Sequence, residues 1–308
     1  MANLQKKGYN PKDVLIKKQW SKYISKGIAL SLMHYNPKSI LFKSYKNTSY
    51  CAETIMTDEI GKVTTTYCKN RWCQTCNRIR TARLINGYLP QIKELFQPVF
   101  VTVTLPTVGG KELKTRIEEM EKAWRGIYKK TVQAKYKKTY PHFKGIRKAE
   151  CTIRPGGKYH YHFHIIMDGW SQGEWFVSQW LKKFPQADKK AQDIRFADEF
   201  SHLELFKYAF KAEVKTSNKT NGKRYDELFR ALRGKRTYQA FGGIRMIKED
   251  FEDEDLENKI VLTERAGSVF KWMKNDWFDK LTGEALVDLD IPDKVQKMID
   301  YPEEIEKE

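Results

Sequence analysis

Residues 148–169 read KAECTIRPGGKYHYHFHIIMDG, and this stretch decides the fold that the sequence predicts. Two runs suited to β-strands flank Pro155-Gly156-Gly157, which is the pattern of a β-hairpin closed by a short loop. Successive side chains of a strand point to opposite faces, so His160, His162 and His164 share one face. The apolar side chains between them face the other way and should pack on a helix. We therefore expect the histidines to line a cavity and not the core.

Glu150 is the acidic residue that the hairpin brings toward the histidines. A three-residue loop pairs Arg154 with Lys158, and counting back from this pair sets Glu150 opposite His162. A two-residue turn would move Glu150 to the wrong face unless a bulge intervened. Imidazoles with a carboxylate and open water positions suit Mn²⁺ and could accept Mg²⁺. The sequence thus predicts a catalytic metal site of His162, His164 and Glu150.

Four cysteines upstream have the spacing of a second metal site. Cys68, Cys73 and Cys76 form C-x4-C-x2-C, and Cys51 can supply the fourth thiolate of a structural, tetrahedral Zn²⁺ site. The alternative is a set of reduced cysteines scattered in a core. The metal would stiffen a short loop whose arginines face phosphates. These arginines are Arg71, Arg78, Arg80 and Arg83. Cys151 stands alone on a strand, so we expect a packed thiol there.

The segment HLELFKYAFKAEVK, residues 202–215, has apolar residues at helical spacing. Four polar side chains would then fall within a narrow arc of the helix. They belong to Glu204, Tyr208, Lys211 and Lys215. A tyrosine has an ordinary pKa near 10, so its attack on a phosphate needs a metal and a nearby cation such as Lys211. Glu204 could deprotonate either the phenol or a later water molecule. Taken alone, such a face is usually only an amphipathic surface.

Charge and composition point to a polyanionic partner. The chain has 57 Lys and Arg against 39 Asp and Glu, a net charge of +18, and nucleic acid is the first candidate. Nothing near the start resembles a signal peptide, and the apolar stretches are far shorter than the roughly 20 residues that span a bilayer. We expect a soluble, cytoplasmic protein without a membrane partner. In a reducing compartment its five cysteines are read first as metal ligands.

The remaining patterns predict an α+β fold, with an antiparallel sheet flanked by helices. Strands are expected at 100–105 and at 238–247, where Gly242-Gly243 interrupts the pattern, and helices at 111–136, 173–183 and 223–233. The lysine-rich residues 1–50 could be a DNA-facing arm, and the alternative is a solvated basic helix around residues 13–34. We expect a basic N-terminal region with the cysteine site at 1–92, a main domain with the histidine and tyrosine motifs at 93–248 and an acidic or helical accessory region at 249–308.

Together these motifs make the sequence similar to the replication initiators of small rolling-circle plasmids, which belong to the HUH endonuclease superfamily. FVTVTLP at 100–106 matches their Thr-rich first motif, and His162-Phe163-His164 matches their histidine motif. The third motif, E-x-x-K-Y-x-x-K, is matched by Glu204, Lys207, Tyr208 and Lys211. YCKNRWCQTC at 67–76 resembles their cysteine segment, and Gly242-Gly243 their glycine pair. The likeness runs from about Cys51 to Ile247 and implies the HUH nickase fold.

The resemblance implies a role for each matching residue. Tyr208 is the nucleophile that forms a 5′-phosphotyrosine and leaves a 3′ hydroxyl as primer, and Glu204 activates water in a terminating cleavage. His162 and His164 bind the metal, and Glu150 stands where an acidic residue is common. Tyr161 replaces a frequent proline, which leaves His160 as either a phosphate contact or a spare ligand. The DNA contacts expected beyond the arginines are His160, Lys207 and Lys215.

The implied partners are origin DNA, single-stranded or cruciform at the nick, a host helicase and a DNA polymerase, with a dimer on the DNA left open. An HUH single-tyrosine transposase or relaxase would share the histidine strand. Such transposases are shorter and usually lack a cysteine cluster, and relaxases place the tyrosine near the N-terminus. A zinc-stabilised DNA-binding regulator without nuclease activity is the alternative from another class. The presence of Glu204, Tyr208 and both paired histidines argues against it.

Overall fold

A computed structural model describes residues 11–133, 138–139, 143–207, 219–247, 260–297 and 299. The chain forms two compact units. One comprises residues 1–79, 213–222 and 250–308, and the other comprises 80–212 and 223–249. The fold is α+β with antiparallel strands flanked by helices, as the sequence predicted, but it has two such sheets where the sequence predicted one. No helix in the described part of the chain has the length and apolarity needed to cross a membrane.

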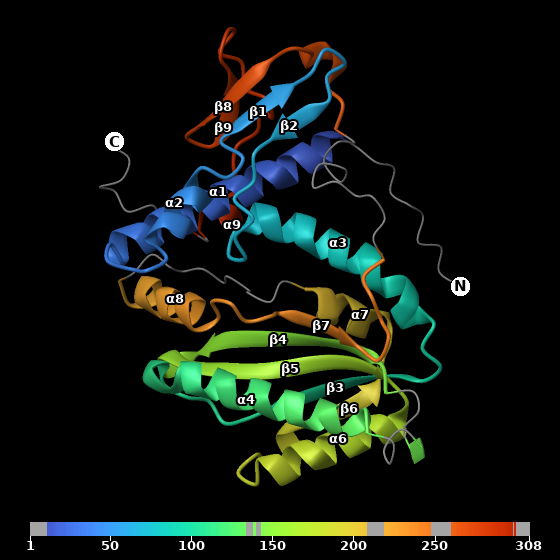
Figure 1. The fold of residues 1–308 in the computed structure, drawn as a ribbon. Helices are drawn as coiled ribbons and strands as arrows, with labels where there is room; N and C mark the ends of the chain where they lie inside the picture. Colours follow the sequence, from blue (N-terminus) through green and yellow to red (C-terminus); the bar gives the residue numbers. More distant parts are fainter. Residues whose placement is uncertain are drawn as a thin grey trace. The chain divides into compact units, whose positions relative to one another are not determined.

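The second unit is built on a five-stranded antiparallel sheet in the order β6-β3-β5-β4-β7 (Figure 1). Its strands are β3 (Pro98–Thr104), β4 (Gly145–Arg154), β5 (Lys158–Asp168), β6 (Asp193–Phe196) and β7 (Tyr238–Phe241). The central strand β5 is almost wholly buried, because β3 and β4 pair with its two edges and helices cover both faces of the sheet.

The β4–β5 hairpin has the predicted register. Arg154 pairs with Lys158 and Glu150 pairs with His162, so the three-residue count across the loop is confirmed. The loop Pro155–Gly157 forms a single 3₁₀ turn. Gly156 and Gly157 have φ angles of 74° and 71°, which a residue with a Cβ rarely adopts. The glycine pair therefore sets the register that brings Glu150 to the histidine face.

Helices cover the two faces of this sheet separately. α4 (Gly110–Thr131) and α6 (Trp170–Lys183) lie on one face, and α7 (Glu199–Phe206) lies on the other (Figure 1). On the α4 face, the rings of Trp124 and Trp180 contact Phe163. On the α7 face, Leu205 and Phe206 join a buried cluster with strand residues. Since Phe163 alternates with the histidines along β5, those histidines belong to the α7 face.

Three of the predicted helices agree closely with observed ones. The helix expected at 111–136 is α4, that at 173–183 is α6, and that at 223–233 is α8 (Lys219–Ala231). The strand expected at 100–105 is β3. The predicted opposition of apolar and histidine faces follows from this arrangement, because α4 and α6 pack on the apolar face.

Two predicted elements are shorter than expected. The helix predicted for 202–215 ends at Phe206, because Lys207 is already extended, with φ −54° and ψ 150°. Residues 208–218, which include Tyr208, Lys211 and Lys215, lie outside the described residues. The strand predicted for 238–247 ends at Phe241. Gly242 and Gly243 follow it with positive φ angles, and no strand resumes over the described residues 244–247.

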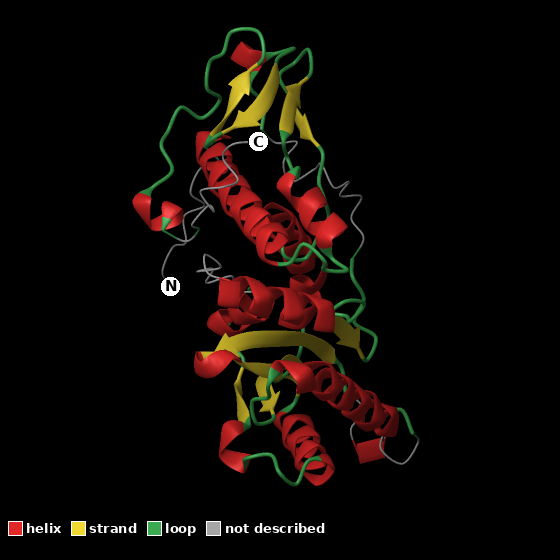
Figure 2. Cartoon of the chain, turned by 90° about the vertical axis from the view of Figure 1, so that its left-hand side faces the viewer, coloured by secondary structure: helices red, strands yellow, loops and turns green. Residues whose placement is uncertain are grey.

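The first unit joins segments from both ends of the chain. It contains α1 (Pro11–Tyr35), α2 (Phe42–Ser49), the first turns of α3 (Gln74–Lys93) and α9 (Asp293–Gln296). Its antiparallel sheet has the order β2-β1-β8-β9, with β1 (Thr54–Thr57), β2 (Val63–Thr65), β8 (Val269–Met273) and β9 (Asp276–Asp279). These short strands lie side by side at the top of both views (Figures 1 and 2). Residues from 1–92 and from 249–308 thus share one sheet.

Helix α1 is largely buried, which corrects the expectation of a solvated basic helix at 13–34. Its Lys22 is fully buried and contacts the Glu53 carboxylate at 2.6 Å and the Ser49 carbonyl at 2.8 Å. Burial lowers the pKa of Lys22, and Glu53 opposes that effect. The ammonium group of Lys22 thus connects α1 to the end of α2 and to Glu53, and composition alone did not reveal this internal role.

Candidate metal centre and its surroundings

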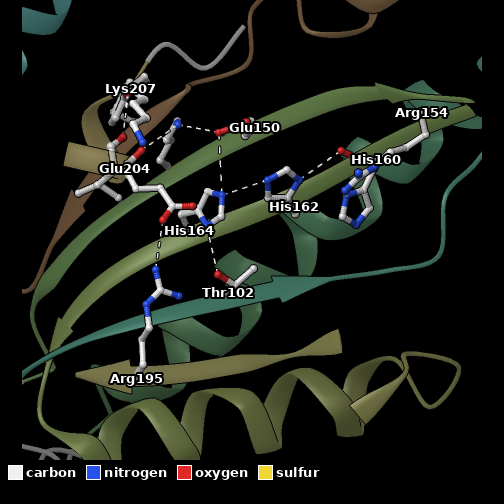
Figure 3. A network of polar contacts seen from close by, with 12 residues as sticks. Thr102, Glu150, Arg154, His160, His162, His164, Arg195, Glu204 and Lys207 are labelled. Atoms are coloured by element: carbon white, nitrogen blue, oxygen red, sulfur yellow. Dashed lines mark hydrogen bonds and ion pairs between the residues drawn. The ribbon is translucent and has the colours of Figure 1, made fainter. Parts of the chain in front are cut away.

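His162 and His164 of β5 and Glu150 of β4 form a buried triad on the α7 face of the sheet (Figure 3). One ligand atom from each residue lies within 4.8 Å of the other two. The Nε2 atoms of the two histidines are 3.1 Å apart, and His164 Nε2 is 3.9 Å from Glu150 Oε2. Adjacent ligands of an octahedral cation with bonds of about 2.1 Å are about 3.0 Å apart. The triad can therefore hold a metal ion.

The outer nitrogen of each imidazole has its own partner. His162 Nδ1 lies 3.2 Å from the carbonyl oxygen of His160, and His164 Nδ1 lies 3.1 Å from Thr102 Oγ1. Because a carbonyl only accepts, His162 must carry its proton on Nδ1, which leaves the Nε2 lone pair for a cation. Thr102 can hold His164 in the same tautomer. It is one of the threonines of β3, and strand pairing sets it opposite His164.

Burial keeps these imidazoles neutral. It lowers the pKa of His164 to about 2, with smaller contributions from His162 and Lys148, and it also lowers the pKa of His162. A neutral imidazole is the form that binds a metal. The two histidines are therefore ready to bind a cation over the whole physiological pH range.

Lys148 is a neighbour of the triad that the sequence analysis missed. It stands two residues before Glu150 on the same face of β4, opposite His164, and its side chain is almost fully buried. Its Nζ lies 2.6 Å from Glu150 Oε2 and donates to the Glu204 carbonyl oxygen at 3.3 Å. One ammonium group thus joins the triad to the last turn of α7. The period-two pattern that selected Glu150 could have found Lys148.

His160 is separate from the triad although it shares the face. Its Nε2 contacts Thr104 Oγ1, and its Nδ1 lies 3.3 Å from a guanidinium nitrogen of Arg154 (Figure 3). Burial lowers the pKa of His160 to about 4, and His162 and Arg154 add to this effect. Among the described residues, His160 is not part of a metal-ligand cluster.

Glu204 and Lys207 lie at the end of α7, to the left of the triad in Figure 3. Glu204 accepts an ion-pair contact of 3.1 Å from Arg195. The hydroxyl of Tyr238 donates to the carbonyl oxygens of Leu205 and Lys207, each at 3.1 Å. The chain is thus fixed up to Lys207, the residue before Tyr208. Tyr208, Lys211 and Lys215 themselves lie outside the described residues.

Cys51, Cys68, Cys73 and Cys76 converge in the first unit, and their sulfur atoms all lie within 4.8 Å of one another. Cys76 Sγ is 3.5 Å from Cys51 Sγ and 3.6 Å from Cys68 Sγ. Thiolates at about 2.3 Å from a tetrahedral Zn²⁺ are about 3.8 Å apart, so the cluster fits that ion. All four are free thiols, not disulfides.

Local structure explains how the cysteine cluster forms. Cys51 follows α2, Cys68 follows β2, and the other two lie at the start of α3. The α3 N-terminus is held because the Gln74 backbone amide donates to Ser25 Oγ at 2.9 Å. Cys151 lies apart in the buried strand β4, and burial raises the pKa of its thiol. The sequence prediction that Cys151 is a packed thiol is confirmed.

The four arginines expected to contact DNA are half-buried. Arg78 donates to Ser21 Oγ at 3.2 Å within the first unit. The others are Arg71, Arg80 and Arg83, and all four take part in contacts within the protein. Their role toward DNA stays a prediction.

Comparison with known proteins identifies the family. Residues 62–276 match the replication protein family, and the chain belongs to it. It is 27% identical over 138 residues to a protein rep of Lentilactobacillus hilgardii, covering 41% of this chain and 42% of that protein. It is 29% identical over 219 residues to a protein rep of Streptococcus pneumoniae serotype 2, covering 62% of this chain and 65% of that protein. The matches thus span less than two thirds of either relative. No solved structure matches.

Proposed function

We propose that the protein initiates rolling-circle replication of a plasmid by nicking one strand of its origin. The observation that carries this proposal is the convergence of His162, His164 and Glu150 within 4.8 Å. Membership of the replication protein family supports it. The resemblance of Glu204, Lys207, Tyr208 and Lys211 to the tyrosine motif supplies the nucleophile.

The triad would hold Mn²⁺ or Mg²⁺ through two neutral imidazole nitrogens and one carboxylate oxygen. This mixed donor set suits Mn²⁺ well and can accept Mg²⁺. When bound, the cation would polarise the scissile phosphate through a non-bridging oxygen. Thr102 and the carbonyl of His160 keep both imidazoles oriented for this.

Tyr208 would attack the phosphorus in line. The bond from the tyrosine oxygen to phosphorus forms while the bond to the 3′ oxygen breaks, and the departing 3′ hydroxyl takes up a proton. Lys211 would favour the phenolate. Two contacts fix the residues before Tyr208: Lys148 binds the carbonyl oxygen of Glu204, and Tyr238 binds that of Lys207. They support the assignment of the attack to Tyr208. A phosphotyrosine ester retains enough of the free energy of the broken phosphodiester bond for the reaction to be reversible.

After one round, Glu204 would activate water for the terminating cleavage. Its carboxylate is partly exposed, at 41% of its side-chain surface, so water and substrate can reach it. His160, Lys207, Lys215 and the four arginines would contact the DNA backbone. A host DNA polymerase would extend the 3′ hydroxyl, and a host helicase would unwind the origin ahead of it. The nick site would be single-stranded or in a cruciform.

The cysteine cluster would bind structural Zn²⁺. The sulfur separations fit a tetrahedral ion, and the loops around the cysteines have little core of their own. The metal would hold the start of α3 against the loop after α2.

A covalent-adduct assay tests the proposed activity. The protein is incubated with an origin oligonucleotide labelled 3′ to the nick and Mn²⁺, and adducts are resolved on a denaturing gel. Wild type should form an adduct, whereas Tyr208→Phe and His162→Ala should not. Cys151→Ala serves as a matched control, since Cys151 lies outside the triad. An adduct with the Phe variant would rule out Tyr208 as the nucleophile.

A further inference from the structure

Arg195 has a fixed position beside the triad. Its guanidinium carbon lies 4.2 Å from the centre of the Phe100 ring, and that ring lies 5.3 Å from the ring of His164. Strand pairing sets Arg195 of β6 opposite Phe100 of β3, so the two share the histidine face. Stacking on an aromatic ring holds the planar guanidinium group of an arginine at a fixed distance from the ring and in a fixed orientation. Only the Phe100 ring therefore separates the guanidinium group of Arg195 from His164, one of the candidate metal ligands.

The present partners of Arg195 are two carboxylates. Its Nη1 contacts Asp193 Oδ2 at 2.7 Å, and its Nη2 contacts Glu204 Oε2 at 3.1 Å (Figure 3). The exposed side-chain fractions are 44% for Arg195, 51% for Asp193 and 41% for Glu204. Exposed ion pairs of this kind are weak, because water screens both charges. A phosphate, which binds arginine through two parallel hydrogen bonds, can therefore compete with them.

We propose that Arg195 is a phosphate-binding subsite that takes a backbone phosphate of the DNA strand and in doing so releases Glu204. This inference rests on the proposed nicking function and deepens it. The guanidinium nitrogens of Arg195 cannot donate full hydrogen bonds to the two carboxylates and to a phosphate at the same time. Strand binding would therefore free the Glu204 carboxylate when a substrate is present, which is when a proton acceptor for water is needed.

Equilibrium binding tests the subsite without any cleavage. The probe is a short fluorescein-labelled oligothymidylate, measured by anisotropy in EDTA over a range of salt concentrations. Arg195→Gln should weaken binding by about tenfold, and it should reduce the slope of log affinity against log salt by about 0.7. Arg195→Lys should keep the slope and lose part of the affinity. Arg233→Gln, an exposed arginine on the turn after α8, is the matched control.

Removing the competing carboxylates should have the opposite effect. Asp193→Asn and Glu204→Gln should each tighten oligothymidylate binding in the wild-type background, and more weakly in the Arg195→Gln background. If removing a carboxylate only reduced the general repulsion between protein and DNA, the affinity would rise equally in both backgrounds. A smaller rise in the Arg195→Gln background excludes that explanation. If Arg195→Gln fails to fold, the same comparison is made in the Arg195→Lys background.

Unchanged affinity and salt slope in Arg195→Gln would overturn the subsite, as would equal effects of Asp193→Asn in the two backgrounds. A different result would overturn the nicking proposal alone. If wild type binds the oligothymidylate through Arg195 but gives no adduct with origin DNA, the phosphate subsite stands and the nickase assignment does not.

Discussion

Lys148 and Glu150 stand two residues apart on β4, and their charged groups meet at 2.6 Å in a nearly dry environment. A buried pair of this kind contributes little net stability, but breaking it leaves one charge without compensation. Here the remaining charge would be a metal ligand. The pair therefore links the stability of the sheet to the charge state of the metal centre.

Lys148→Met should lower the free energy of unfolding of the metal-free protein by about 3–5 kcal/mol, because it strands the Glu150 carboxylate. Adding Mn²⁺ should restore part of this loss, since the cation replaces the ammonium as the partner. Urea unfolding in EDTA and in Mn²⁺ measures both effects. Lys144→Met is the control, because Lys144 pairs with Asp168 at 3.7 Å while 35% exposed and should cost about 1 kcal/mol at most. Equal losses with and without Mn²⁺ would contradict the link.

The low pKa of His164 predicts a loss of stability in acid. A folded-state pKa of about 2, below the unfolded value near 6.5, means that the unfolded chain binds the proton first. Stability is therefore lost as the pH falls below about 6.5, and continues to fall until about pH 2. For this group the loss between pH 7 and pH 5 is about 2 kcal/mol. Metal-free His164→Gln should lose less stability than wild type over this interval in urea unfolding.

Thr102→Val should weaken Mn²⁺ binding by about 10–100-fold, because His164 loses the hydroxyl that orients its ring. Isothermal titration calorimetry of Mn²⁺ measures this directly. Thr102→Ser keeps the hydroxyl and should restore the affinity. Thr104→Val removes a hydroxyl that contacts His160 and not the triad, so its Mn²⁺ affinity should stay near that of wild type. A normal affinity in Thr102→Val would show that packing alone orients the imidazole.

Cys73→Ser should abolish zinc binding and lower the unfolding temperature, because three sulfur ligands cannot close a tetrahedral site. The zinc content is measured by mass spectrometry of the purified protein. Cys151→Ala should keep its zinc, since Cys151 lies in the other unit. Zinc retained at the wild-type level by Cys73→Ser would remove the cysteine cluster as a metal site.

The hairpin, the histidine face and the cysteine cluster could be predicted because each depends on residues close in sequence. A glycine loop fixes the pairing of Glu150 with His162, and strand alternation does the rest. Arg195 could not be found in this way. It reaches the site only because β6 pairs with β3, a contact between strands that lie far apart in the chain.

The two errors in the helices have the same origin. The first turns of α1 are buried because β8 and β9, formed near the other end of the chain, build a core against them that includes Leu15 and Phe270. α7 ends at Phe206, where Tyr238 binds the last carbonyl groups. Local propensity contains no information about either contact, since both depend on residues more than 30 positions away.

Pairing of Ile55 with Phe270 also constrains how this protein can be made. β1 is synthesised long before β8, so during translation it can pair only with β2 and its other edge stays open. A prematurely terminated chain could still close the histidine hairpin, but it would carry an unpaired strand edge that invites aggregation.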